Sequence, residues 1–119
     1  MQLNKTLSLF VVIVFASSCV QKTLKKTVVF ELDTSKIKSI KTVGIRGENR
    51  PLKWNRSIDM KSVKPDTTYT ATLTFLTGYK FVEMKFLVND EFELKDDDNR
   101  RIYFSDKDTI YYRAVFDKK

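Results

Sequence analysis

The sequence predicts one small all-β domain, a single immunoglobulin-like antiparallel β-sandwich of about seven to eight strands. Turn-forming residues recur about every 8 to 12 residues along the chain. Several segments between them alternate apolar and polar side chains with the period of two that a strand shows when one face covers a core. No segment after residue 18 has the apolar stripe of an amphipathic helix. A small barrel is the alternative architecture.

The expected strands are short runs rich in β-branched and aromatic residues. They are residues 26–32, 42–45, 57–61, 69–75, 81–88, 91–95, 101–105 and 109–116. The clearest is 69–75, where Tyr69, Ala71, Leu73 and Phe75 share one face and threonines occupy the other. This pattern predicts a strand that faces the core on one side.

The connections follow from local turn chemistry. Segment 50–55 contains Pro51 and predicts a loop, since proline cannot donate to a sheet ladder. Turns are also expected at Pro65-Asp66, at Asn89-Asp90 and at residues 106–108. Segment 34–40 is either a helical turn or a loop.

Composition restricts the chemistry available to the chain. Cys19 is the only cysteine and there is no histidine. Neither a disulfide within one chain nor a Cys/His zinc site can be built, and histidine-based catalysis is excluded. We therefore expect no cofactor and no metal.

The chain is basic, with 22 Lys and Arg against 15 Asp and Glu and a net charge of +7. The two signs are interleaved, as in residues 95–101 (KDDDNRR), which favours a solubilising surface over a nucleic-acid interface. The exception is Lys22, Lys25 and Lys26, which follow Cys19 closely and would face anionic head groups if the chain is anchored there.

Residues 1–18 show the three parts of a secretory signal peptide. Lys5 is the positive region, residues 7–15 (LSLFVVIVF) form an apolar run too short to span a membrane, and Ala16-Ser17-Ser18 supplies a small-residue cleavage site. The expected organisation is a signal peptide at 1–18, a tether at 19–26 and a β-sandwich domain at 27–117.

The small residues followed by Cys19 resemble a bacterial lipobox, in which the cysteine is acylated after cleavage. The family pattern prefers leucine where this chain has Ala16. The resemblance implies a lipoprotein of the cell envelope, periplasmic or in the outer membrane, held through Cys19. The alternative is an ordinary signal peptide with an incidental cysteine.

Two groups of side chains suggest chemistry. Glu83 with one of Asp96 to Asp98 would supply the carboxylate pair of a glycoside hydrolase, and the same acidic run would offer oxygen ligands to calcium. A solvated turn is the favoured interpretation, so we expect a protein that binds and does not catalyse. Trp54, the only tryptophan, is either a binding ring in a loop or a core residue at one end of the sandwich.

Residues 27–116 resemble the starch-binding modules of carbohydrate-binding module family 20 and the related glycogen-binding domains. The landmarks follow the family's order. They are the strand at 42–46 with Leu52-Lys53-Trp54, the strand at 69–75 with Gly78, Glu83-Met84-Lys85-Phe86, and Asp98-Asn99-Arg100. The resemblance implies the sandwich fold already predicted from periodicity.

The resemblance also implies a sugar site. Matched position by position, the family's site residues fall on Trp54, Lys85, Leu94 and Asn99. Leu94 stands where the family has a second tryptophan, which implies a one-ring platform and weaker binding. Tyr69 matches a family aromatic that can serve a second sugar site, although its place in the alternation favours core packing.

The expected function is non-catalytic binding of starch or another α-glucan by a lipid-anchored protein. The alternative is a structural or protein-interaction module on the same fold, with a degenerate sugar site and an unidentified protein partner. A hydrolase is a third and weaker reading.

Overall fold

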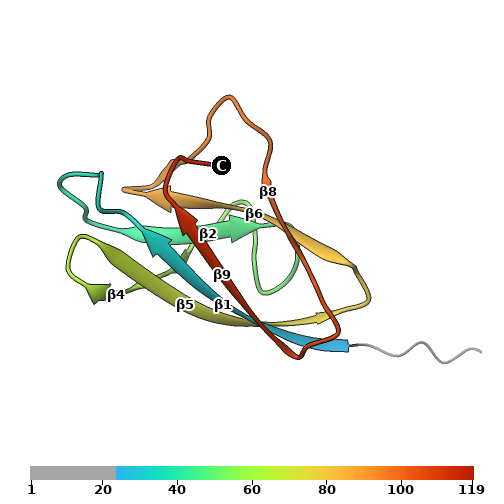
Figure 1. The fold of residues 1–119 in the computed structure, drawn as a ribbon. Helices are drawn as coiled ribbons and strands as arrows, with labels where there is room; N and C mark the ends of the chain where they lie inside the picture. Colours follow the sequence, from blue (N-terminus) through green and yellow to red (C-terminus); the bar gives the residue numbers. More distant parts are fainter. Residues whose placement is uncertain (1–23) are drawn as a thin grey trace, which may run out of the picture.

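The computed structural model describes residues 24–119, which form two facing β-sheets (Figure 1). One sheet has the order β4-β5-β1-β9, and the other has the order β3-β2-β6-β7 with β8 also paired to β6. The predicted all-β sandwich is confirmed. The predicted signal peptide, Cys19 and Lys22 lie outside the described residues.

The strands lie close to the predicted segments. Their bounds are β1 Leu24–Asp33, β2 Val43–Gly47, β3 Ile58–Asp59, β4 Lys61–Lys64, β5 Thr68–Thr77, β6 Phe81–Val88, β7 Glu91–Phe92, β8 Arg100–Tyr103 and β9 Thr109–Val115. Segment 34–40 is a loop with a turn at 35–36 and contains no helix.

The core lies between the sheets. Phe30 of β1, Phe75 of β5 and Phe86 of β6 are fully buried, and the rings of Phe30 and Phe86 meet edge to face with centroids 6.2 Å apart. Tyr69, Ala71 and Leu73 pack against this cluster from β5, as the alternation predicts. The expected core role of Tyr69 is therefore confirmed.

One strand pair departs from the predicted antiparallel arrangement. β9 runs parallel to β1, from Thr27 beside Thr109 to Asp33 beside Val115 (Figure 1). A parallel pair is possible because β9 follows β8 of the other sheet through a crossing segment, and only a tight hairpin forces two strands to be antiparallel.

Segment 57–61, predicted as one strand, is divided between the sheets. β3 pairs with β2 and β4 pairs with β5, and the buried Met60 lies between them. The chain therefore crosses from one sheet to the other at the residue that it buries.

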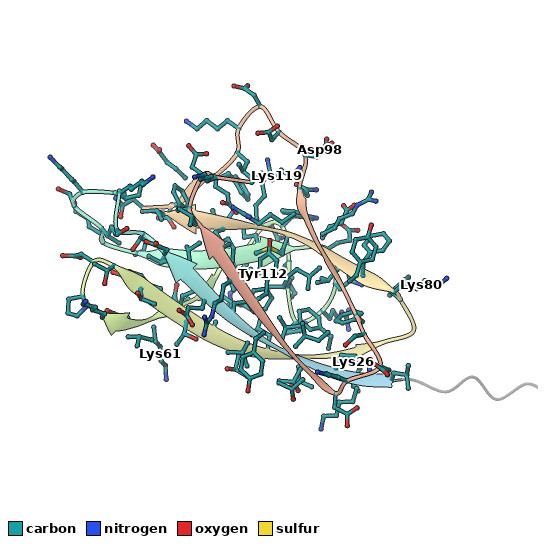
Figure 2. All side chains as sticks on the ribbon, in the orientation of Figure 1. Lys26, Lys61, Lys80, Asp98, Tyr112 and Lys119 are labelled. Atoms are coloured by element: carbon teal, nitrogen blue, oxygen red, sulfur yellow. The ribbon has the colours of Figure 1, made fainter. Side chains whose placement is uncertain are left out.

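β1 begins at Leu24, so the last three residues of the predicted tether belong to the sheet. Lys25 is exposed, but Lys26 is buried and its Nζ donates hydrogen bonds to the carbonyl oxygens of Ser105 (2.8 Å) and Lys107 (3.0 Å). The expectation that Lys26 faces lipid head groups is wrong, because its ammonium holds the loop that precedes β9. Figure 2 shows Lys26 beside that loop.

Candidate functional site

Trp54 lies in the loop between β2 and β3, and hydrogen bonds hold it at both the ring and the backbone. Its Nε1 donates to Oε2 of Glu48 at 2.6 Å, and its carbonyl accepts a hydrogen bond from Nη1 of Arg46 at 3.2 Å. The residue is half-buried and is not part of the core cluster. The loop therefore presents a fixed indole at the surface instead of filling one end of the sandwich.

Phe92 of β7 provides a second ring beside Trp54. The ring centroids are 6.3 Å apart and the planes are tilted by 51°. The guanidinium of Arg46 lies over the Phe92 ring, with Cζ 5.4 Å from its centroid. These contacts form a surface with two aromatic rings. The resemblance to starch-binding modules implies a platform with one ring.

Hairpin register could have identified Phe92. Asn89 and Asp90 both have positive φ, 52° and 62°, as the predicted tight turn requires. A two-residue turn pairs Phe92 with Leu87, two residues after Lys85 on the same strand. Phe92 and Lys85 must then share a sheet face.

Lys85 lies on the outer face of β6, and its ammonium is bound to the loop that follows β7. Its Nζ donates to the carbonyl oxygens of Leu94 (2.7 Å) and Asp97 (3.1 Å). An ammonium has three donors, so one remains for a ligand. Lys85 therefore shapes one wall of the site and carries a donor into it.

Asn99 lies at the end of the same loop. Its Nδ2 donates to Oε2 of Glu83 at 3.4 Å, and Oε1 of Glu83 accepts a 2.8 Å hydrogen bond from Nε of Arg101. Both oxygens of Glu83 are thus engaged with neighbouring side chains. This arrangement orients the Asn99 amide and leaves its carbonyl oxygen as an acceptor.

These side chains border one hollow of about 460 Å³, which we call the tryptophan hollow. Its lining residues are Trp54, Lys85, Glu91, Phe92, Lys95 and Asn99. The fold therefore brings together three of the four site residues expected from the sequence.

Leu94, the fourth expected residue, does not line the tryptophan hollow. It is only 5% exposed, its φ is 52°, and its N–H donates to Oδ1 of Asp117 at 2.7 Å. The positive φ also ends the strand predicted for 91–95 after Phe92. The leucine therefore packs inward, and the second ring of the site comes from Phe92.

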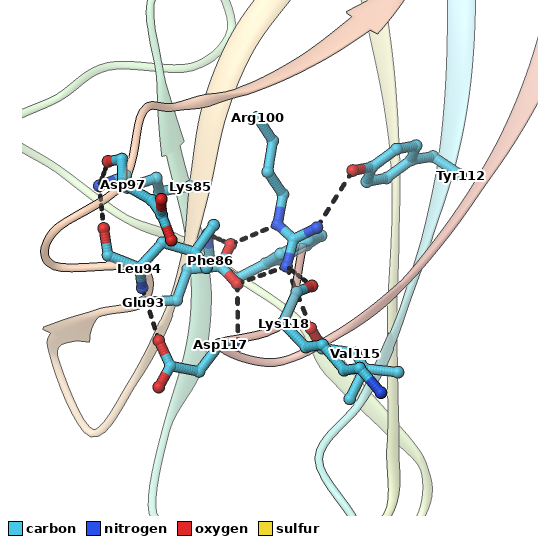
Figure 3. A network of polar contacts seen from close by, with 10 residues as sticks. All are labelled: Lys85, Phe86, Glu93, Leu94, Asp97, Arg100, Tyr112, Val115, Asp117 and Lys118. Atoms are coloured by element: carbon cyan, nitrogen blue, oxygen red, sulfur yellow. Dashed lines mark hydrogen bonds and ion pairs between the residues drawn. The ribbon is translucent and has the colours of Figure 1, made fainter.

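A buried ion pair holds both ends of the loop that carries Leu94 and Asn99 (Figure 3). Glu93 Oε2 lies 2.7 Å from Arg100 Nε, and Glu93 Oε1 lies 2.8 Å from Arg100 Nη2. The Glu93 carboxylate also accepts hydrogen bonds from the backbone N–H groups of Phe86 (2.8 Å) and Asp117 (3.1 Å). Sequence reasoning placed Arg100 in a motif and did not identify its partner.

Arg100 extends this network to the end of the chain. It donates to the hydroxyl of Tyr112 and to the carbonyl oxygens of Val115 and Lys118. Burial alone lowers the pKa of Arg100, but its hydrogen bonds to Glu93 and Tyr112 and the charge of Glu93 outweigh burial and raise it. The guanidinium is therefore a permanent cation that fixes the C-terminal segment beside the site loop.

The acidic run Asp96 to Asp98 is exposed in this loop, and Figure 2 shows Asp98 at its outer side. Within residues 24–119, no three acidic side chains come together in a way that could hold a metal ion. In the same part of the chain, no helix is long and apolar enough to cross a membrane.

Comparison with known proteins adds no family assignment. The chain matches none of the protein-family models against which it was scanned, and a search of curated proteins finds no match. The fold and the site geometry define an all-β sandwich with an aromatic surface hollow.

Proposed function

We propose that this chain is an exported, lipid-anchored protein of the cell envelope that binds α-glucan without catalysis. The observation that carries the proposal is the tryptophan hollow, where two aromatic rings meet a lysine and an asparagine on one sheet face. The order of the sequence landmarks, which resembles that of starch-binding modules, supports the same choice of ligand.

Sugar chemistry matches this lining. A pyranose ring has an apolar C–H face that packs on an aromatic ring, and its hydroxyls need donors and acceptors at the rim. Trp54 and Phe92 supply the rings, while Lys85 and Asn99 supply a donor and an amide. The two ring planes are tilted by 51°, and this angled surface suits a curved α-linked glucose chain better than a straight, flat β-linked chain.

The absence of catalysis is supported by the state of Glu83, the carboxylate that a glycoside hydrolase would pair with one of Asp96 to Asp98. Glu83 accepts hydrogen bonds from both Arg101 and Asn99, so both of its carboxylate oxygens already have partners within the protein. The chain has no histidine to act as a general base. Binding is the function that this site supports.

Affinity electrophoresis in soluble starch and calorimetry with β-cyclodextrin test the proposal. The wild-type domain should be retarded by starch, Trp54→Ala should abolish retardation, and Phe92→Ala should weaken binding by about tenfold or more. Tyr111→Ala is the matched control, since Tyr111 is 73% exposed on β9 of the other sheet. Unretarded migration of the wild-type domain would sink the proposal.

The anchor is tested separately in the full chain. Radiolabelled palmitate should label the wild-type protein, and Cys19→Ser should abolish the label and release the protein from membranes. Equal labelling of the two forms, or no label on either, contradicts lipidation at Cys19.

A second candidate is a protein-interaction module on the same fold. The observation in its favour is that β9 forms one edge of the four-stranded sheet and exposes Tyr111. Absence of glucan binding, together with cross-linking of one stoichiometric partner through β9, would favour this function over the first.

A further inference from the structure

A second hollow lies beside the start of β6. It has a volume of about 790 Å³ and we call it the Phe81 hollow. Its lining includes two carboxylates, two cations and three apolar or aromatic side chains: Glu48, Glu83, Arg50, Lys80, Leu76, Tyr79 and Phe81. Figure 2 shows Lys80 at this end of β6, whereas Asp98 is in the loop that borders the tryptophan hollow.

The Phe81 hollow also contains aromatic surface. The Phe81 ring packs beside Tyr103, with centroids 5.5 Å apart, and the Arg101 guanidinium lies 4.8 Å from its centroid. Tyr79 and Leu76 are 71% and 72% exposed at its rim. Both hollows are therefore lined by aromatic side chains, and the Phe81 hollow has exposed Tyr79 and Leu76 in addition.

Two carboxylates connect the hollows. Glu48 and Glu83 both line the Phe81 hollow. Glu48 accepts a hydrogen bond from the indole N–H of Trp54, and Glu83 accepts one from the side-chain amide of Asn99. The N–H of Glu48 also donates to the carbonyl oxygen of Glu83 at 3.0 Å. Trp54 and Asn99 line the tryptophan hollow, so each carboxylate joins one hollow to the other.

Strand geometry places Phe81 and Lys85, one lining residue from each hollow, on one face of β6. Phe81, Glu83 and Lys85 alternate with the buried Val82 and Met84 along β6, so the first three side chains point outward together. Two residues of a strand advance about 6.7 Å, which separates Phe81 from Lys85 by roughly 13 Å. The outer face of β6 therefore connects a lining residue of one hollow to a lining residue of the other.

The charges of the Phe81 hollow indicate a neutral ligand. Two carboxylates, Glu48 and Glu83, balance two cations, Arg50 and Lys80. A strongly charged ligand of either sign would meet like charges in this balanced lining. A neutral polyhydroxyl chain finds donors, acceptors and an aromatic ring.

We propose that the two hollows form one binding track for a linear α-glucan chain long enough to lie across Glu48 and Glu83. This proposal rests on the proposed function, and it adds that chain length determines affinity. Short oligosaccharides occupy the tryptophan hollow alone, and longer chains gain contacts with Phe81 and Tyr79.

Calorimetry with maltotriose, maltoheptaose and a longer soluble maltodextrin tests this track. In the wild-type domain, affinity should rise about tenfold or more between the shortest and longest ligands. Phe81→Ala should bind maltotriose and β-cyclodextrin as the wild type does and lose the gain with length. Trp54→Ala should lose binding of all ligands.

Tyr79→Ala is the second variant, since Tyr79 is largely exposed and its replacement disturbs the core less than that of Phe81. Tyr79→Ala should reduce the rise in affinity with chain length and leave the affinity for maltotriose unchanged. Tyr111→Ala should change neither the affinity for maltotriose nor its rise with chain length. Equal wild-type affinity for short and long chains overturns the track and leaves the proposed function standing. The track is also overturned, and the proposed function left standing, if affinity rises with chain length in Phe81→Ala and Tyr79→Ala as much as in the wild type. If the wild-type domain binds none of these sugars, both the track and the proposed function are overturned.

Discussion

The carboxylate of Glu93 and the guanidinium of Arg100 form a two-point ion pair inside the protein, with N–O distances of 2.7 and 2.8 Å. Glu93 directly follows Phe92, and Arg100 directly follows Asn99. The pair therefore closes the loop that separates the second ring of the tryptophan hollow from its amide.

Breaking this pair should destabilise the whole domain. Glu93→Gln leaves a buried guanidinium without its counter-charge, and we expect a loss of about 3 to 5 kcal/mol in the free energy of unfolding. Chemical denaturation measures this loss. Glu31→Gln is the control, because the Glu31–Arg113 pair is 3.5 Å long and exposed and should contribute less than about 1 kcal/mol.

The double variant Glu93→Met, Arg100→Met tests whether the two charges stabilise the protein as a pair, through its free energy of unfolding compared with those of the two single variants. It removes both charges together, so it should cost less than the two single substitutions added. A cost equal to their sum would show that the pair acts through independent contacts.

The hydrogen bond between Trp54 and Glu48 gives a fluorescence test, because Trp54 is the only tryptophan. Glu48→Ala frees the indole N–H, and we expect its emission to move to longer wavelength and glucan affinity to fall several-fold. Glu48→Gln keeps an acceptor and should change both less. Identical spectra and affinities for Glu48→Ala and the wild type would contradict a positioning role for Glu48.

Gly47 supports the site through close packing. A Cβ at Gly47 would lie 2.5 Å from the carbonyl oxygen of Glu83 and 2.7 Å from Cδ1 of Leu52. Gly47→Ala must push β2 away from β6, and we expect a loss of about 1 to 3 kcal/mol of stability. Gly78→Ala is the matched control with an open surrounding, and it should change stability by no more than about 0.5 kcal/mol in thermal or chemical denaturation.

Asp33 gives a pH-dependent prediction. Hydrogen bonds from the Ser35 side chain and backbone hold the pKa of this carboxyl below its ordinary value of 3.8. A lowered pKa contributes stability that is present above the ordinary value and is lost as the pH falls through the lowered one. The contribution is small, because Asp33 is exposed.

Two measurements check this prediction. Denaturation of Asp33→Asn should show a shallower loss of stability below about pH 4 than the wild type does. NMR titration should find the Asp33 pKa below 3.8 in the wild type and closer to 3.8 in Ser35→Ala. A wild-type value at or above 3.8 contradicts it.

Much of the fold is readable from short segments. The alternation at 69–75 placed Tyr69 and Phe75 toward the core, and Asn89-Asp90 marked the hairpin between β6 and β7. Period-two alternation and turn chemistry depend on neighbours in the chain, so a linear sequence contains them. That Trp54, Lys85 and Asn99 lie in one site is implied by the family resemblance and not by any local pattern. These residues come from separate segments, which meet only in the folded sandwich.

The sequence by itself determined the all-β class, the positions of most strands, and a chemistry without histidine or a second cysteine. Only the tertiary structure decided that β9 lies parallel to β1, that Lys26 is buried, and that Phe92 replaces Leu94 beside Trp54. Those outcomes depend on segments far apart in the chain. A buried ammonium, for example, must find carbonyl oxygens wherever the closed core leaves them, and no local pattern specifies that place.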